Sequence, residues 1–425
     1  MRHLLVLAAL APFGAAFAQA PMKLTLAEAG RLAIRNNPQF SAAQFTAAAA
    51  AQVPNQYKAG LLPSLSGNLT GVGADNGSRL AAGGLNNPVV YDHVGSGLTV
   101  GQLLADFGRT SNLVGMAKLR AAAQDQATES TRAGILMAVG AAYFGVLKAQ
   151  SVLRVANETV QQRQVVVDQV TALARNKLRS TLDVSFASVN LSDAKLLQVQ
   201  ARNDLEATEA QLAAAIGLPG ETAFELSEEP MPAAMPDRAA DLIAVAIRNR
   251  PELKELRLQQ GAAERFAKAE HALFYPSVGV LGTAGFVPAG EAAIPGRYGA
   301  IGMNVNIPIF NGGLFRARQT EAELQAKAAQ QNVNDLQNRV IRDVRVAWLN
   351  SATAYDRIAL THELLQQAQL SLDLAQSRFD LGLGSFVDLS QAQLNLTSAA
   401  IATASALYDY QVQRLLVDYQ TGVLH

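Results

Sequence analysis

The 425-residue sequence contains no cysteine. This absence excludes disulfide bonds, thiolate metal sites and catalytic thiols, and we also expect no lipid anchor on an N-terminal cysteine. An excess of charge is missing too, because 35 basic residues balance 35 acidic ones, so we expect no nucleic-acid partner. The five histidines are scattered without metal-ligand spacing. Since no phosphate-binding loop or cluster of catalytic side chains is found either, the sequence predicts no cofactor, no metal site and no enzyme.

Long apolar runs are missing after the first twenty residues. The longest such run, at 134–147, is shorter than the roughly 18–20 residues that a membrane helix needs. The first twenty residues are typical of a secretory signal peptide, because Arg2 precedes an apolar stretch that ends in small residues. We expect cleavage after Ala18 or Ala20. An exported chain of this kind must cross a bilayer with β-strands if it crosses one at all.

A tandem repeat organises the rest of the sequence. The phrase AIRNNP at 33–38 returns as AIRNRP at 246–251, which is 213 positions later. Further pairs recur at an offset of 205, namely Val100 with Val305, Gly108 with Gly313, Tyr143 with Trp348, and Asp183 with Asp388. We therefore predict one repeat at 21–217 and a second at 238–425, joined by a proline-rich connector at 218–237.

Each repeat contains two segments in which apolar and polar residues alternate, and the alternation is less regular in the first repeat. In 299–307 (GAIGMNVNI), the odd positions are apolar or glycine, and the even positions include two asparagines. A period of two predicts a strand with one apolar and one polar side. Tyr91, Phe286 and Tyr298 could lie at a membrane interface or could be isolated surface aromatics. We expect strands of about ten residues, long enough to cross a bilayer when tilted, at 64–73, 94–104, 277–286 and 298–307.

Elsewhere the apolar period is that of a helix. Small and apolar residues alternate spacings of four and three in 135–160, and the same spacing recurs in 340–365. Helical phase from about 108 to 177 corresponds to a rod of roughly 100 Å, and its small residues favour coiled-coil-like packing. We predict helical hairpins at 108–216 and 312–421.

Short helices should precede the strands of each repeat. Thr25-x-x-Glu28 fits a capping box at the start of one short helix. Pro54 should kink or end the helix expected at 39–59. Asp106 and Asn311 are expected to cap the two long helices that follow the strands.

The number of strands constrains the assembly. Four strands do not close a barrel, and an open edge in lipid leaves backbone groups unpaired at several kcal/mol each. Known single-chain barrels begin at about eight strands. Several copies must therefore pool their strands, and the long helices must continue the wall on the aqueous side. Export combined with membrane-spanning strands indicates the outer membrane of a double-membraned bacterium.

The residues LTLAEAGRLAIRNNP, LLPSLSG, QLLADFG and LGLGSFVDLSQAQLNL follow one another in the first and last thirds of the chain. With AIRNRPEL, FYPSVGV and IPIFNGG, they resemble the TolC family of outer-membrane efflux and secretion channels, over nearly the whole mature chain. The resemblance implies a mixed α and β membrane protein. In it, three tandem-duplicated subunits form a twelve-stranded β-barrel that continues as a long α-helical barrel in the periplasm, with the connector in its equatorial region.

The resemblance also implies partners and a function. A periplasmic adaptor protein and an inner-membrane pump of the RND, ABC or MFS class would dock to the helical end, while outer-membrane lipid would surround the barrel. The chain would then be a passive exit duct for drug or small-molecule efflux or for type I protein secretion. The alternative is an exported structural or adhesive coiled-coil protein whose glycine-rich segments are only loops, and the alternation at 299–307 argues against it.

Two turns between the long helices carry the candidate functional residues. The resemblance marks them as the tips that dock the adaptor, whereas a local reading is that glycine and serine only satisfy turn geometry. Some relatives carry a basic residue four positions before the second-repeat aspartate, and it helps to lock the closed aperture. That position is Gly384 here, and the basic residue stands in the first repeat, so any such latch is placed differently. The candidate tip residues are Leu178, Arg179, Ser180, Leu383, Gly384 and Ser385.

Asp183 and Asp388, which follow the two turns, are the candidate aperture residues. Ser180-x-x-Asp183 and Ser385-x-x-Asp388 both fit a capping box for the returning helix. The resemblance places Asp388 near the periplasmic constriction, where three copies would form an acidic ring that favours cations. The capping role and the ring role can coexist.

Overall fold

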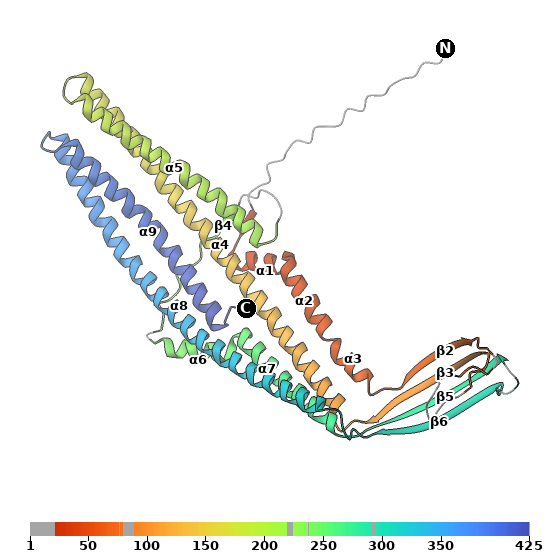
Figure 1. Cartoon of the computed structure of the whole chain (residues 1–425). Helices are drawn as coiled ribbons and strands as arrows, with labels where there is room; N and C mark the ends of the chain where they lie inside the picture. Colours follow the sequence, from red (N-terminus) through yellow and green to blue (C-terminus); the bar gives the residue numbers. More distant parts are fainter. Residues whose placement is uncertain are drawn as a thin grey trace, which may run out of the picture.

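The structure is a computed structural model that describes residues 22–75, 77–79, 89–218, 224–236, 238–290, 292 and 294–424. The expected signal peptide and its cleavage site lie outside these residues, as does part of the expected connector. The described chain is elongated, with long helices forming an arm and a four-stranded sheet extending from one end of it (Figure 1).

The elements follow the same order in the two halves of the chain. The first half contains β1 (Met22–Leu24), α1 (Leu26–Asn36), α2 (Pro38–Ala50), α3 (Val53–Ala59), β2 (Ser64–Val72), β3 (His93–Ala105), α4 (Arg109–Arg175) and α5 (Thr181–Ala215). The second contains β4 (Phe224–Leu226), α6 (Ala239–Asn249), α7 (Pro251–His271), the 3₁₀ helix η1 (Ala272–Phe274), β5 (Ser277–Gly290), β6 (Arg297–Asn306), α8 (Leu314–Asp380) and α9 (Phe386–Thr421). Helices α4 and α8 each have 67 residues, or about 100 Å at 1.5 Å per residue.

Local sequence accounts for the helix boundaries in the first half. The Thr25 hydroxyl accepts from the Glu28 N–H (3.3 Å) and the Glu28 carboxylate accepts from the Thr25 N–H (3.0 Å), which completes the expected capping box. Pro54 lies in the first turn of α3, so the break between α2 and α3 falls just before it. Asp106 caps α4 by accepting from the Thr110 N–H at 2.7 Å.

The sheet has the strand order β2-β3-β5-β6, and all three pairings are antiparallel. The two halves of the chain therefore meet at the β3–β5 pairing in the middle of the sheet. The strands overlap the ranges expected from residue alternation. The largest difference is at β5, which continues to Gly290 instead of ending at 286.

The register separates an apolar from a polar face, because residues paired across strands share a face. Across the four strands, the row Leu65, Val100, Gly282 and Ile301 is apolar. The next row is Ser66, Thr99, Thr283 and Ala300, on the opposite face. On that second face the Asn68 amide donates to the Thr99 hydroxyl at 3.2 Å. The alternation seen in the sequence thus continues from strand to strand across these rows.

The helices form a layer that continues the strand order. Near the sheet, α2 and α3 pack on α4, α4 packs on α7, and α7 packs on α8. Towards the far end of the arm, α5 packs on α4, α4 on α9, and α9 on α8. Helix α8 therefore lies at one edge of the layer, with α6 packed against it in the middle of the arm, and α5 or α3 lies at the other edge (Figure 1).

Residues 224–236, here called the strap, cross the middle of the arm and are held by side chains of three long helices. Tyr143 is fully buried in the largest hydrophobic cluster, and this burial, with the nearby Glu229 charge, raises its pKa to about 12. Tyr143 and Trp348, 205 positions apart, both donate to strap carbonyls. The three aromatic donors are Tyr143 to Ser227 (2.6 Å), Tyr410 to Ala233 (2.6 Å) and Trp348 to Pro236 (2.8 Å).

In the described residues, α4 alone is long and apolar enough to cross a membrane by length and composition. The uninterrupted apolar run at 134–147 is too short for a membrane helix. A window that admits a few polar residues is longer and reaches the length of a membrane helix. Nearly half of its most apolar window, 44%, is buried inside the chain. Helix α4 packs on α1, α2, α3, α5, α7 and α9. Packing within the arm thus accounts for its composition.

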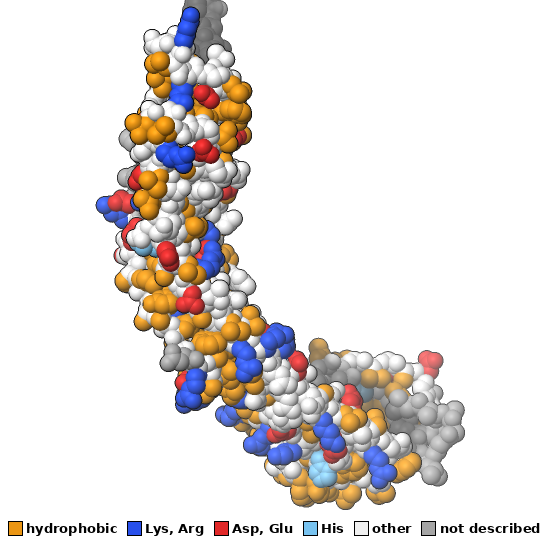
Figure 2. Space-filling model, turned by 90° about the vertical axis from the view of Figure 1, so that its left-hand side faces the viewer, with side chains coloured by type: hydrophobic (Ala, Val, Ile, Leu, Met, Phe, Trp, Pro, Cys, Tyr) orange, Lys and Arg blue, Asp and Glu red, His pale blue; other side chains and the backbone are white. Residues whose placement is uncertain are grey.

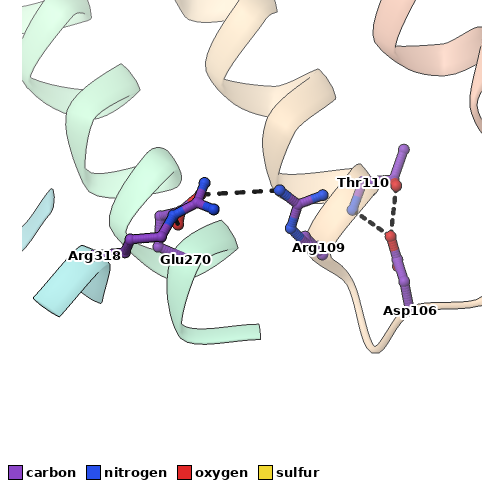
Figure 3. A network of polar contacts seen from close by, with 5 residues as sticks. All are labelled: Asp106, Arg109, Thr110, Glu270 and Arg318. Atoms are coloured by element: carbon purple, nitrogen blue, oxygen red, sulfur yellow. Dashed lines mark hydrogen bonds and ion pairs between the residues drawn. The ribbon is translucent and has the colours of Figure 1, made fainter. Parts of the chain in front are cut away.

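A buried carboxylate ties three helices together where the arm meets the sheet (Figure 3). Glu270, near the end of α7, has a side chain only 2% exposed. Arg318 of α8 approaches it closely (Nε to Oε2, 2.7 Å), and Arg109 of α4 lies at 4.0 Å. Both arginines are partly exposed, so they neutralise the carboxylate while keeping contact with solvent. The cluster fixes the helices next to the strands that they adjoin.

We predict that Arg318→Met lowers the free energy of unfolding by about 3 kcal/mol, because it leaves the buried Glu270 charge with only a distant partner. The control is Arg316→Met, at an exposed position on the same helix, which should change stability by less than about 0.5 kcal/mol. Guanidinium unfolding in detergent, followed by circular dichroism, measures both values. Equal losses in the two variants would contradict a structural role for the cluster.

Candidate functional site

The turns joining α4 to α5 and α8 to α9 lie together at the end of the arm farthest from the sheet (Figure 1). They share the same backbone pattern. The Leu178 N–H donates to the Leu173 carbonyl (2.9 Å), and the Leu383 N–H donates to the Arg378 carbonyl (2.8 Å). This bond closes the end of a helix when the residue before it has a positive φ. The structure therefore brings the two sets of candidate tip residues to one end of the molecule.

The positive-φ position differs between the turns. In the second turn it is Gly382 (φ 74°), and in the first it is Lys177 (φ 59°). A side chain in the left-handed region is strained by about 1 kcal/mol or more, so the first turn is the less relaxed of the two. Gly384 has little free space, because a Cβ built there would lie 3.2 Å from the Arg378 Cβ and 3.3 Å from the Phe379 nitrogen. The backbone itself thus favours glycine at this position.

Both candidate aspartates take part in capping boxes. Ser180 accepts from the Leu182 N–H (3.1 Å), and Asp183 accepts from the Ser180 N–H (3.4 Å). The second box is tighter, because Asp388 accepts both from the Ser385 hydroxyl (2.8 Å) and from its N–H (3.2 Å). The helix-capping reading of each aspartate is therefore realised in the structure.

The environment of Asp388 keeps its carboxylate charged. Hydrogen bonds from the hydroxyl and backbone of Ser385 hold its pKa below the ordinary value, and the Arg378 charge acts in the same direction. A lowered pKa means that the cap contributes its stabilisation at pH values above the ordinary carboxyl pKa. The contribution disappears as the pH falls through the lowered pKa. At neutral pH, Asp388 therefore presents an exposed negative charge beside the turn.

Arg179 joins the first turn to the second hairpin. Its guanidinium lies 4.0 Å from the centre of the Phe379 ring and donates to the Phe379 carbonyl. Phe379 is buried against Phe386 (ring centres 5.8 Å apart), which in turn stacks on Phe186 of α5 (6.5 Å). Arg179 thus stands over an aromatic cluster shared by both hairpins. It joins the two turns through an aromatic and a carbonyl contact, not through Asp388.

Sequence reasoning missed the polar contacts between the hairpins further from the tips. Arg163 of α4 is 5% exposed and donates to Gln393 of α9, and burial lowers the pKa of its guanidinium. Asn190 and Ser390 also join the hairpins, at 2.7 Å. A signal for Arg163 exists in the sequence, because Ala156, Arg163 and Val170 follow one another at intervals of seven residues and all three are buried.

Exposed apolar side chains surround the turns. Leu178 and Leu383 are each 70% exposed. Leu182 and Val387, in the first turn of each returning helix, are also exposed. Apolar side chains gathered on an exposed end of a molecule mark a surface for another protein. The capping serines and aspartates hold the backbone beneath this surface in place.

At the other end of the molecule, the three aromatics expected at a membrane interface do not share one environment. Phe286 pairs with Ser96, two residues along each strand from the paired Leu98 and Ala284. Residues two apart share a face, so Phe286 is on the apolar face of the sheet. Tyr298 alternates with Ala300 and Gly302 and is on the polar face. Phe286 and Tyr298 therefore lie on opposite faces of the sheet, and the interface reading stays a prediction.

We predict that Arg179→Ala loosens the paired tips, because it removes the cation–π contact and the hydrogen bond to the Phe379 carbonyl. A local loss of roughly 1–2 kcal/mol corresponds to amide hydrogen exchange about 5 to 30 times faster in 379–386. Exchange followed by mass spectrometry measures the effect. Arg175→Ala, at an exposed position of α4 one turn earlier, should leave the rate unchanged. Equal exchange rates in the unmodified protein and in both variants would contradict a role for Arg179 in holding the tips together.

Comparison with known proteins places these features in a family. Residues 29–218 and 242–418 match the family described as outer membrane efflux protein. The chain is 24% identical over 407 residues to the outer membrane protein TolC of Salmonella enteritidis, covering 92% of this chain and 80% of that protein. It is 26% identical over 417 residues to the alkaline protease secretion protein AprF of Pseudomonas aeruginosa, covering 94% and 85%.

A solved structure has the same fold. The outer membrane protein VceC of Vibrio cholerae superposes with a TM-score of 0.78 at 20% identity, over 93% of this chain and 96% of that one. The family match covers both halves of the chain, including the four strands and most of both helical hairpins. The chain belongs to the outer membrane efflux protein family.

Proposed function

We propose that this chain is the subunit of a passive outer-membrane exit duct, in which three copies close a single channel. Family membership supports the outer-membrane location and the exit route. TolC carries the name of an outer membrane protein, and AprF is named for the secretion of a protease. The open edges of the subunit support the closure by several copies, and they carry the proposal.

The sheet leaves two edges open. Among the described residues, β2 pairs only with β3, and β6 pairs only with β5. One side of each outer strand thus has backbone groups without a strand partner, which in lipid is unfavourable by several kcal/mol per group. Pairing of β6 from one copy with β2 of the next removes both edges. Three copies give twelve strands, the number that the family resemblance implies.

The edge helices of the arm have a second apolar surface. At about 100° per residue, most of the exposed apolar residues of α5 and α8 lie on the side of each helix that faces away from its buried residues. Hydrophobic side chains are accordingly visible along the surface of the arm (Figure 2). The exposed residues include Leu182, Phe186, Val189, Leu196 and Val199 on α5, and Leu324, Val346, Leu349, Leu360, Leu364, Leu370 and Leu374 on α8.

A helix with two apolar sides needs two packing partners. Helix α4 already covers one side of α5, and α9 covers one side of α8. In a ring of copies, α5 of one subunit and α8 of the next supply the missing partners for each other. The helical layer then closes at the same junctions as the sheet, which supports a helical barrel that continues the β-barrel.

The two faces of the sheet fit this arrangement. The apolar face, with residues such as Leu65, Val100 and Ile301, is directed towards lipid. The polar face, with Asn68 and Thr99, lines a water-filled lumen. The alternative of an exported coiled-coil protein required the glycine-rich segments to be loops, whereas the structure has four paired strands there.

At the far end of the arm, we propose that the exposed leucines of the two turns dock a periplasmic adaptor. The adaptor connects the duct to an inner-membrane pump of the RND, ABC or MFS class, and the pump supplies the energy. The duct itself catalyses no reaction. Both efflux of small molecules and type I secretion are compatible with this geometry. Arg179 and the aromatic cluster beneath it hold the tips closed until the partners engage.

We predict that Leu360→Asp prevents assembly, because it places a carboxylate in the apolar contact between subunits, at several kcal/mol per buried ion. The expected result is loss of the heat-modifiable trimer on electrophoresis and a monomer in detergent. Gln366→Asp, which is also on the exposed surface of α8 but about 120° around the helix from Leu360, is the matched control and should assemble normally. A Leu360→Asp protein that still forms stable trimers would contradict the proposed junction.

We also predict that Asp388→Asn reduces the preference of the channel for cations, because three copies of this carboxylate form an acidic ring. Reversal potentials in planar bilayers under a salt gradient measure this preference. The wild-type preference should decline towards that of the variant as the pH falls through the lowered pKa of Asp388. Asp183→Asn measures the contribution of the equivalent carboxylate in the first turn. If Asp388→Asn leaves the reversal potential unchanged, the aspartate acts only as a cap.

A further inference from the structure

One row of the sheet combines two glycines with a tyrosine. Asn68, Gly97, Gly285 and Tyr298 are paired in sequence across the four strands, so all four lie on the polar face. If the proposed function holds, this face lines the lumen of the channel. The row lies towards the end of the sheet farther from the helices, since Tyr298 is the second residue of β6.

The tyrosine ring lies flat over the two glycines. A Cβ built at Gly97 would be 2.1 Å from the Tyr298 hydroxyl oxygen and 3.0 Å from its Cζ. A Cβ built at Gly285 would be 2.5 Å from the same two atoms. Real Cβ atoms do not approach other atoms this closely. The tyrosine ring therefore occupies space that the Cβ of any non-glycine residue at position 97 or 285 would fill. Tyr298 thus crosses β5 and reaches the backbone of β3.

Other glycines on this face have no such neighbour. Gly302 is on the same face and the same strand, and a Cβ built there would meet nothing within 4 Å. Glycine is unfavourable inside a strand because it has no side chain to pack and loses much conformational freedom on folding. An aromatic ring laid over a strand glycine offsets part of this loss. The space above Gly97 and Gly285 is therefore filled by one particular side chain, that of Tyr298.

We propose that Gly97 and Gly285 form a notch that holds Tyr298 flat against the lumen wall, and that this placement sets the bore of the outer part of the channel. When a larger side chain replaces one of these glycines, the Tyr298 ring has no room against the wall and must project into the lumen. Three copies would then project at the same level. The inference rests on the proposed function, because only a channel has a lumen that the ring could narrow.

Gly97→Ala is the variant that tests the notch. The closest atom to the added methyl group is the tip of the Tyr298 side chain, which can move. Gly285→Ala is less suitable, because its methyl group would also lie 2.3 Å from the Ser96 carbonyl oxygen and would displace the backbone. Gly302→Ala is the matched control, since it adds the same group to the same face in open space.

The absence of native cysteine allows a direct measurement. Asn304→Cys introduces a single thiol on the polar face, six residues further along β6 than Tyr298, or about 20 Å at 3.3 Å per residue. Thiol reagents that do not cross membranes, applied to intact cells, must pass the level of Tyr298 to reach it. A small maleimide and maleimides attached to polymers of increasing size report the bore at that level. Heat-modifiable trimer is checked for each variant.

We expect Gly97→Ala to slow labelling by the larger reagents while the small one still reacts. Adding Tyr298→Ala to Gly97→Ala should restore the wild-type rates, and Gly302→Ala should not change them. Equal labelling of the Gly97→Ala and unmodified backgrounds at every reagent size would overturn the notch but leave the duct intact. Failure of the small reagent to label Asn304→Cys in the unmodified background would instead contradict the proposed lumen itself.

Discussion

The arrangement of this chain depends on one constraint, which is that backbone N–H and C=O groups at a sheet edge have no hydrogen-bond partner in lipid. Four strands are too few to close on themselves, which is the reason for our proposal that β2 and β6 pair with strands of other copies. The helices obey the same order, because each strand of the sheet is continued by a helix of the arm. As a result, the open edges of the sheet and the uncovered apolar sides of α5 and α8 lie along the same two borders of the subunit. Membrane closure and helix packing are thus satisfied by a single assembly.

Within the subunit, the two halves repeat the same plan but differ where the structure needs a specific contact. Tyr143 and Trp348, at equivalent positions, both hold the strap by donating to its carbonyls. At the tips, Lys177 has the left-handed conformation that Gly382 has in the other turn. Near the sheet, Glu270 is buried between arginines, whereas Tyr57, its counterpart in the first half, packs beside an apolar cluster. The duplicated plan accounts for the shared architecture of the two halves, and these differences account for their specific contacts.

Much of the fold could be predicted from the sequence because its signals are local. Alternation over ten residues located the four strands, and a period near 3.6 located the long helices, since both depend on neighbouring residues alone. The serine and aspartate of each capping box are three residues apart and were equally visible. The contact of Arg179 with Phe379 joins residues 200 positions apart and has no local pattern. The flat position of Tyr298 was also hidden, because it depends on the register between strands and not on the spacing within one.

The β3–β5 pairing has a consequence for biogenesis. The centre of the sheet joins a strand from the first half to a strand from the second, so the hairpin of β2 and β3 has no inner neighbour until most of the polypeptide has been exported. During that interval it presents an unprotected strand edge with an apolar face, which is the type of surface that aggregates. Productive folding therefore requires the nascent hairpin to be shielded in transit, and the waiting time is set by the length of chain that separates the two strands.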